Sequence, residues 1–207
     1  MPLKLNEREY RAMSLSPTTD NKRLESDYYV EGYATTFNQP YVLWENDGIK
    51  YWEVVDRHAL DGADLSDIIM QYDHQGRVYA RNKMGGGQPA TLIADPDEVG
   101  FFVAAGLHLT DGSQTLYRDI TSGLIYKMSW SFVVSEDSYD SNTRTRTILR
   151  VKKVYDVSAV SIPANAATEI SARSWLDGVI EVEKREALAR QNLIRKLKLK
   201  IKMEEIK

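Results

Sequence analysis

The chain has 207 residues, of which 43% are hydrophobic and 28% are charged, and its formal net charge is −3. A chain of this size and composition can bury a core, so we expect one globular domain with an appendage. It has no run of 18 apolar residues, which argues against a membrane partner, and its net charge gives no reason to expect a nucleic-acid partner. It also has no cysteine and only three histidines, which excludes disulfides and a thiol nucleophile and argues against structural zinc.

The N-terminal residues 1–26 are polar and mixed in character. They have no apolar signal-peptide core, so we expect an intracellular protein. The stretch "SPTTDNK" is typical of a loop. We predict a flexible N-terminal arm over residues 1–26, with a short first strand as the alternative.

Most of the remaining chain carries strand patterns. The stretch "YYVEGYATTF" is rich in aromatic and β-branched residues, which favour strands, and "DPDEVG" is typical of a hairpin connection. The last of the predicted strands is long and should contain a bend. The predicted strands cover residues 28–37, 49–56, 68–74, 77–82, 90–94, 100–107, 124–135 and 144–162.

Residues 110–123 form the clearest helix pattern. The segment begins with Thr110, a good N-terminal cap, and ends at Gly123, while Leu116 and Ile120 recur at helical spacing. Many strands with few helices indicate a mainly β fold with peripheral helices (α+β). We predict a closed or nearly closed antiparallel β-barrel domain over residues 27–173.

The tail, residues 174–207, has a different character. From Lys184 to Lys202 it contains eight basic residues and one acidic residue. Leu193, Leu197 and Ile201 recur every fourth residue, which predicts a basic amphipathic helix. The subsegment "KLKLKIK" also alternates with period two, so a strand is the alternative.

The stretch "YKMSWSF", residues 126–132, places two serines in an apolar run. Successive side chains of a strand point to opposite faces, so Ser129 and Ser131 share the face opposite the apolar side chains. Small polar residues on the solvent side of a strand are an ordinary explanation for this pattern. The spacing alone does not select either serine as a nucleophile.

A serine nucleophile needs a base, usually a histidine that is oriented by a third group. The candidate bases are His58, His74 and His108. His58 and His108 are consistent with ordinary surface positions. His74 ends an apolar strand where the chain enters a loop, and loops are where catalytic side chains are often presented.

Asp156 is the candidate third group, because it lies inside the apolar run "VYDVSAVSI". A carboxylate in such a run is costly to desolvate unless it is paired. Either an imidazole or a salt bridge to Arg150, Lys152 or Lys153 would satisfy it. The residues by themselves favour the salt bridge.

Taken together, residues 25–173 resemble the prohead (capsid maturation) proteases of tailed bacteriophages, a family related in fold to the herpesvirus assemblin proteases. "VEGYATTFN" is similar to the opening strand of that family, and "EVVDRHALDG" is similar to the segment that precedes its histidine strand. "MQYDHQGRVYAR" is similar to the strand that carries the catalytic histidine, which corresponds to His74. The resemblance implies an antiparallel β-barrel of the assemblin type.

Two further segments carry the resemblance. "SGLIYKMSWSF" resembles the strand in which the serine after methionine is the nucleophile, which corresponds to Ser129; Ser131 stands where the family usually has glycine. "VYDVSAVSIPANAATEISAR" resembles the segment that carries the acidic residue, here Asp156 in place of the more usual glutamate. The resemblance therefore implies a catalytic triad of Ser129, His74 and Asp156.

The resemblance also implies a function: a serine endopeptidase without cofactor or metal, packaged within the procapsid in the host cytoplasm. Its expected partners are the phage major capsid protein with its scaffold segment, and the protease itself through autoproteolysis. A homo-oligomer is a further alternative, because the herpesvirus relatives dimerise. The rival interpretations are a non-catalytic capsid assembly or scaffolding protein on the same barrel, and an unrelated β-barrel binding module.

Three segments have weaker interpretations. Backbone N–H groups usually stabilise the oxyanion, and a guanidinium from "RTRTILR" (144–150) is an additional candidate, although a solvated hairpin face is the simpler explanation. "GGGQ" (85–88) lacks the continuation of a phosphate-binding loop, so we expect a flexible loop there. The basic tail fits an encapsidation or scaffold-binding helix that is itself a target of self-cleavage. A solubilising helix and a genome-binding segment are the alternatives.

Overall fold

The computed structural model describes residues 8–17, 22–46, 48–161, 181–182, 184–198 and 201. The chain divides into two compact units: one is Leu5–Ala172, and the other comprises Met1–Lys4 and Arg173–Lys207. The domain limits that we predicted remain predictions.

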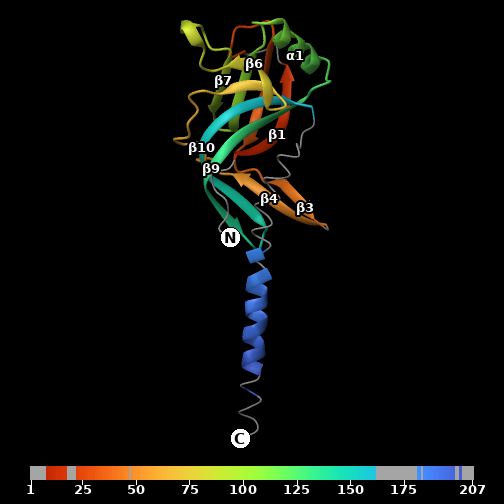
Figure 1. Cartoon of the computed structure of the whole chain (residues 1–207), viewed down its shortest axis with the longest axis vertical. Helices are drawn as coiled ribbons and strands as arrows, with labels where there is room; N and C mark the ends of the chain where they lie inside the picture. The colour runs from red at the N-terminus through yellow and green to blue at the C-terminus, as the bar shows by residue number, and fades with distance from the viewer. Residues whose placement is uncertain are drawn as a thin grey trace. The chain divides into compact units, whose positions relative to one another are not determined.

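The larger unit consists mainly of strands, and its ribbon is drawn in Figure 1. One α-helix, α1 (Asp111–Thr121), and one 3-10 turn, η1 (Gly85–Gly87), accompany the strands. The strands are β1 (Arg8–Pro17), β2 (Tyr29–Thr36), β3 (Tyr41–Asn46), β4 (Ile49–Val55), β5 (Ile69–Tyr72), β6 (Gln75–Arg81), β7 (Leu92–Pro96), β8 (Gly100–Gly106), β9 (Lys127–Asp140) and β10 (Thr145–Val160).

The strands form a ten-stranded sheet in the order β3-β4-β10-β9-β1-β2-β8-β7, with β5 attached to β10 and β6 attached to β5. Most pairs are antiparallel, as expected, but β10 pairs in parallel with both β4 and β5. The prediction of a purely antiparallel arrangement was therefore wrong for these pairs. Near the ends of β6 and β7, the N–H of Thr91 donates to the carbonyl of Arg81 at 3.0 Å. No ladder joins these two strands in the described part of the chain, so the predicted barrel is not confirmed.

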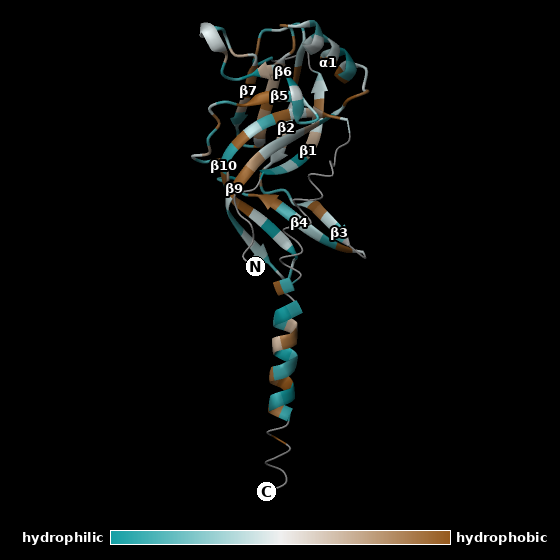
Figure 2. Ribbon diagram, in the orientation of Figure 1, coloured by the Kyte–Doolittle hydropathy of each residue, from teal (hydrophilic) through white to brown (hydrophobic). Residues whose placement is uncertain are grey.

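The main core lies on one face of this sheet, and a smaller buried cluster of Tyr29, Phe102 and Ala104 is separate from it. Hydrophobic and hydrophilic residues alternate along several of the strands (Figure 2). On β9, Met128, Trp130 and Phe132 are fully buried. Leu116 and Ile120 of α1 join the same core, and Thr110 caps that helix by accepting a hydrogen bond from the N–H of Ser113. The helix that we predicted over residues 110–123 is thus confirmed.

The N-terminal segment is the main departure from expectation. Residues 8–17 form strand β1, which lies in the middle of the sheet between β9 and β2, so the structure favours our alternative of a strand over a flexible arm. Gly32 permits the pairing with β2, because a Cβ there would lie 2.6 Å from the carbonyl oxygen of Ser14. The strand was hard to recognise because charged residues, Glu9 and Arg11, occupy its buried positions.

Strand β3 was not among the predicted strands, which left residues 38–48 without a predicted element. It forms a hairpin with β4 at one end of the sheet. The bend expected in the last strand corresponds to irregularities in the pairing of β10 with β9 between Ile148 and Asp156.

In the tail, residues 181–182, 184–198 and 201 are helical, as predicted. This includes residues 196–198 of "KLKLKIK", whereas residues 199–200 lie outside the described part. Figure 2 shows charged and apolar residues along this helix, and Leu193, Leu197 and Ile201 are exposed. Within the described residues, no helix is both long enough and apolar enough to cross a membrane.

Candidate active site

Ser129 and Ser131 lie on β9, in the middle of three adjacent strands. Ser131 is paired with Tyr10 of β1 and Asp156 of β10, and Ser129 is paired with Ala12 and Ser158 of the same two strands. Residues directly opposite each other in a sheet project from the same face. The two serines therefore belong to a polar face that is opposite the core face of Trp130.

His74 reaches this polar face from the turn between β5 and β6. Asp73 and His74 form a two-residue hairpin loop with positive φ angles of 49° and 59°, and Tyr72 pairs with Gln75 on either side of it. A turn of this kind requires φ > 0 at both central residues. Asp73 holds the turn in place, since its carboxylate accepts hydrogen bonds from the N–H and hydroxyl of Ser161, both at 2.9 Å.

The imidazole of His74 contacts the carboxylate of Asp156. Nδ1 of His74 lies 2.6 Å from Oδ1 of Asp156, and the two side chains are only 7% and 5% exposed. The same carboxylate oxygen accepts a hydrogen bond from the hydroxyl of Ser158 at 2.7 Å. This arrangement fixes the imidazole tautomer with its proton on Nδ1, which leaves Nε2 as the basic atom.

Two polar atoms of this cluster remain without partners. Among the described residues, Nε2 of His74 and Oγ of Ser131 are buried and make no hydrogen bond. Buried polar groups are nearly always paired, so each exception needs an explanation. A buried Nε2 that makes no hydrogen bond is available to act as a general base when substrate arrives.

The two serines differ in accessibility. Ser129 retains 4% of its surface, whereas Ser131 is 0% exposed. Ala12, the β1 neighbour of Ser129, is small, while Tyr10, the β1 neighbour of Ser131, is large. A substrate carbonyl therefore has more room above Ser129 than above Ser131.

The other two histidines lie elsewhere. His58 is exposed and pairs with Asp61, and His108 is exposed and contacts the hydroxyl of Ser26. Neither contacts a buried carboxylate in the described part of the chain. The structure thus brings His74, Asp156 and the two serines together and leaves His58 and His108 out.

The basic residues near Asp156 have other partners. Lys153 pairs with Asp64, and Arg150 pairs with Glu136. Among the described residues, Asp156 forms no salt bridge with Arg150, Lys152 or Lys153, so the salt bridge that the residues by themselves favoured is not present.

The arginines of residues 144–150 are also distant from Ser129 along the sheet. Ser129 pairs with Ser158, and Arg150 lies eight residues before it, roughly 25 Å along an extended strand. Arg146 is buried and binds Glu9, Glu53 and Asp137. The structure thus gives no support to a guanidinium at the oxyanion.

Arg146 belongs to a buried ionic cluster on the core side of β1. The cluster joins two arginines to three carboxylates and a tyrosine: Arg11, Arg146, Glu9, Glu53, Asp137 and Tyr41. Burial raises the pKa of Glu9, but Arg146 and Arg11 outweigh it and hold that pKa below its ordinary value of 4.5. Burial lowers the pKa of Arg11, but Glu53 and its neighbours hold it well above the ordinary value. The ion pairs of this cluster fix β1 against β4 and β10.

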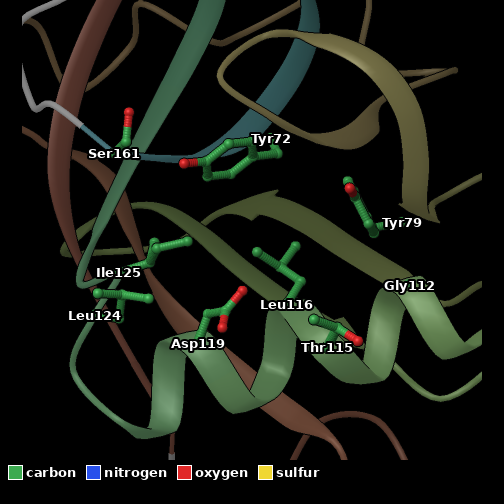
Figure 3. A pocket seen from close by; sticks show the side chains of 9 residues that line it. All are labelled: Tyr72, Tyr79, Gly112, Thr115, Leu116, Asp119, Leu124, Ile125 and Ser161. Atoms are coloured by element: carbon green, nitrogen blue, oxygen red, sulfur yellow. The ribbon is translucent and has the colours of Figure 1, made fainter.

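A separate hollow of about 690 Å³ lies between α1 and the turn that carries His74 (Figure 3). Figure 3 shows Tyr72 and Ser161 on one side and residues of α1, including Leu116 and Asp119, on the other. None of the predicted site residues lines it. Its nine lining residues are Tyr72, Tyr79, Gly112, Thr115, Leu116, Asp119, Leu124, Ile125 and Ser161.

Sequence reasoning missed two residues of the site. Ser158 could have been found, because it lies two positions after Asp156 and therefore shares its face. Tyr10 could not, since its ring packs edge-on against His74, 64 residues away, with 4.6 Å between ring centroids and 67° between ring planes. No local sequence pattern signals such a contact.

Comparison with known protein families identifies the class of protein to which the chain belongs. Residues 17–179 match the model of the caudovirus prohead serine protease family, so the chain belongs to that family. No curated protein and no solved structure gave a significant match to the chain. Family membership supports a serine peptidase role in capsid maturation. A relationship to the herpesvirus assemblin fold remains a prediction.

Proposed function

We propose that the chain is a serine endopeptidase that cleaves the scaffold segment of its phage's major capsid protein, and also itself, inside the procapsid. The observation that carries this proposal is the buried pair of His74 and Asp156 on the same sheet face as Ser129. Family membership supplies the class of reaction and its setting in the host cytoplasm. No cofactor or metal takes part in the proposed reaction.

In the proposed mechanism, Nε2 of His74 removes the proton from the hydroxyl of Ser129 as that oxygen attacks the scissile carbonyl. The carbonyl oxygen becomes an oxyanion, which backbone N–H groups stabilise. His74 then gives the proton to the departing amine, which leaves an acyl group on Ser129. Water, activated by His74, hydrolyses this ester and restores the enzyme. Asp156 keeps the imidazole in the required tautomer and stabilises its protonated form.

Ser129 is favoured over Ser131 as nucleophile for a steric reason. Ser129 has accessible surface and a small neighbour on β1, while Ser131 has no accessible surface and lies between Tyr10 and Asp156. The position of Ser129 after Met128 also agrees with the family resemblance. Ser131 is then a buried neighbour of the triad.

The test is intact-mass analysis during overexpression of the wild type beside Ser129→Ala, Ser131→Ala and His74→Ala. We expect the wild type and Ser131→Ala to shorten with time while the other two variants stay whole. If all four remain full length even with the matching capsid protein supplied, the chain is a non-catalytic assembly protein. If only Ser131→Ala stays whole, Ser131 is the nucleophile.

For the basic C-terminal helix, we propose binding to the scaffold segment during encapsidation. Its described residues carry six basic side chains: Lys184, Arg185, Arg190, Arg195, Lys196 and Lys198. The exposed apolar residues Leu193 and Leu197 lie among them. Deletion of residues 181–207 should leave the peptidase reaction intact and reduce the number of protease copies recovered in procapsids. Unchanged recovery would favour a solubilising role.

A further inference from the structure

We propose that Tyr10 is a positioning residue for His74, so that the N-terminal strand β1 is part of the active site. This inference rests on the proposed function, because it assigns Tyr10 a role through the general base. The family match begins at residue 17 and therefore includes only the last residue of β1. The structure nevertheless pairs β1 with β9, the strand that carries Ser129.

The imidazole of His74 needs a second contact to hold its orientation. Within the described residues its only hydrogen bond is the one from Nδ1 to Asp156, and Nε2 has none. The covalent bond to Cβ and this single hydrogen bond still allow the ring to tilt, and a tilt moves Nε2. The ring of Tyr10 packs against it edge-on at 4.6 Å, in the geometry that aromatic pairs prefer. Asp156 and Tyr10 together therefore determine where Nε2 points.

The position of Tyr10 is itself fixed by its neighbours in sequence. Glu9 and Arg11 project from the opposite face of β1 and bind Arg146 and Glu53 in the buried ionic cluster. A shift of β1 by one residue would turn these charges toward His74 and Tyr10 toward the core. The ionic cluster thus sets the register that places Tyr10 beside Ser131, in the same row as Asp156.

The ring of Tyr10 carries this role, and its hydroxyl does not. No hydrogen bond to that hydroxyl occurs in the part of the chain that the structure describes. A phenylalanine in place of Tyr10 should therefore preserve the reactivity of Ser129. A leucine or methionine keeps the apolar volume but removes the flat ring edge that restrains the imidazole. This difference separates positioning from simple burial.

The experiment measures phosphonylation of Ser129 by a fluorophosphonate probe in the full chain: the serine oxygen bonds to phosphorus, fluoride leaves, and His74 takes the hydroxyl proton. For Tyr10→Leu and Tyr10→Met we expect the maximal rate of phosphonylation to fall 10- to 100-fold, with a half-saturating probe concentration within twofold of wild type. Tyr10→Phe should stay within twofold in both quantities. Tyr126→Leu, a change at an exposed tyrosine, is the matched control and should have no effect.

Proton NMR gives a second readout that does not depend on turnover. The low-field signal of the His74 Nδ1 proton, bound to Asp156, should persist in Tyr10→Phe and broaden or disappear in the leucine and methionine variants. Retention of both the rate of phosphonylation and this signal in a folded Tyr10→Leu or Tyr10→Met protein overturns the inference. If neither variant folds, absence of nuclear Overhauser contacts between the Tyr10 and His74 rings in the wild type overturns it equally. The proposed function fails separately, if the probe does not modify Ser129 in the wild type itself.

Discussion

The two faces of β1 and its neighbouring strands carry polar clusters of opposite character. On the core face, Glu9 and Arg11 join a buried ionic cluster in which each carboxylate and each guanidinium has charged partners. On the other face, Tyr10 packs against His74, and Nε2 of His74 and Oγ of Ser131 have no partners among the described residues. Both clusters are buried, and the same strand contributes to both.

The comparison of these two clusters shows how a structural polar cluster can be distinguished from a reactive one. Burial of charge is tolerated where every group is paired, and such pairs fix the register of the strands around them. A buried basic nitrogen without a hydrogen-bond partner does not help to fix the strands. Its presence in the fold therefore indicates a catalytic role. Completeness of pairing, more than burial, distinguishes the two faces.

The largest effect should come from Ser129. Ser129→Ala removes the proposed nucleophile, and we expect the rate of capsid-protein cleavage to fall by about 10⁴-fold or more. Ser131→Ala, two residues away on the same face, should retain at least a tenth of the rate. Cleavage is followed by gel densitometry with purified protein and the matching capsid protein. Comparable losses in both variants would contradict the assignment of distinct roles.

Asp156→Asn should have the next largest effect. An amide cannot stabilise the protonated imidazole and favours the wrong tautomer, so the acylation rate of Ser129 should fall by about three to four orders of magnitude. Asp64→Asn is the control, because Asp64 is an exposed carboxylate that pairs with Lys153. A loss of less than tenfold in Asp156→Asn would mean that another group orients His74.

On the core face, Arg11→Met should destabilise the fold. It leaves Glu53, which is 0% exposed, with one fewer cation, and removal of one partner of a buried ion pair costs about 3–5 kcal/mol. The free energy of unfolding is measured by urea denaturation. Arg150→Met breaks an exposed pair with Glu136 and should cost less than about 1 kcal/mol. Equal effects would show that the ionic cluster does not hold the sheet together.

The smallest predicted effect is a pH dependence of stability. The pKa of Glu9 is lowered in the folded state, because its arginine partners outweigh burial, so its contribution is present above the ordinary value of 4.5. As pH falls below that value, the free energy of unfolding should decrease until the folded pKa is passed. Glu9→Gln should be less stable than the wild type at neutral pH, and its free energy of unfolding should decrease less as the pH falls.

Urea denaturation at intervals between pH 7 and pH 3 checks this dependence. Glu98→Gln is the control, because Glu98 is an exposed glutamate for which no ion pair occurs among the described residues, so it should leave the decline of the free energy of unfolding in acid unchanged. If the free energy of unfolding of Glu9→Gln falls as steeply in acid as that of the wild type, Glu9 does not contribute to the pH dependence.

Much of the fold could be predicted from local patterns. β2, β8 and β10 are rich in aromatic or β-branched residues, and α1 has a cap, an apolar stripe and a terminal glycine. β1 could not be predicted with the same certainty, since its buried charges reverse the expected alternation. The parallel pairing of β5 with β10 depends on contacts distant in sequence, so no local pattern indicates it.

The active site, like the fold, has some residues that local sequence patterns predicted and others that they did not. Alternation placed Ser129 and Ser131 on one face, but only the family resemblance selected Ser129, His74 and Asp156. The residues alone favoured a salt bridge for Asp156, because a basic side chain three to six positions away is a common partner. Its actual partner, His74, comes from a turn 82 residues away. Tyr10 was missed because β1 was not expected to reach the site.

The assignment of Ser129 as nucleophile is tested most directly by mapping the residue that a fluorophosphonate modifies. The wild type and His74→Ala are treated with the probe, digested, and sequenced by tandem mass spectrometry, which separates an adduct on Ser129 from one on Ser131. If Ser129 is the nucleophile and His74 its general base, we expect a single adduct on Ser129 in the wild type and none at the same dose in His74→Ala. An adduct on Ser131, or equal labelling of Ser129 without His74, would contradict it.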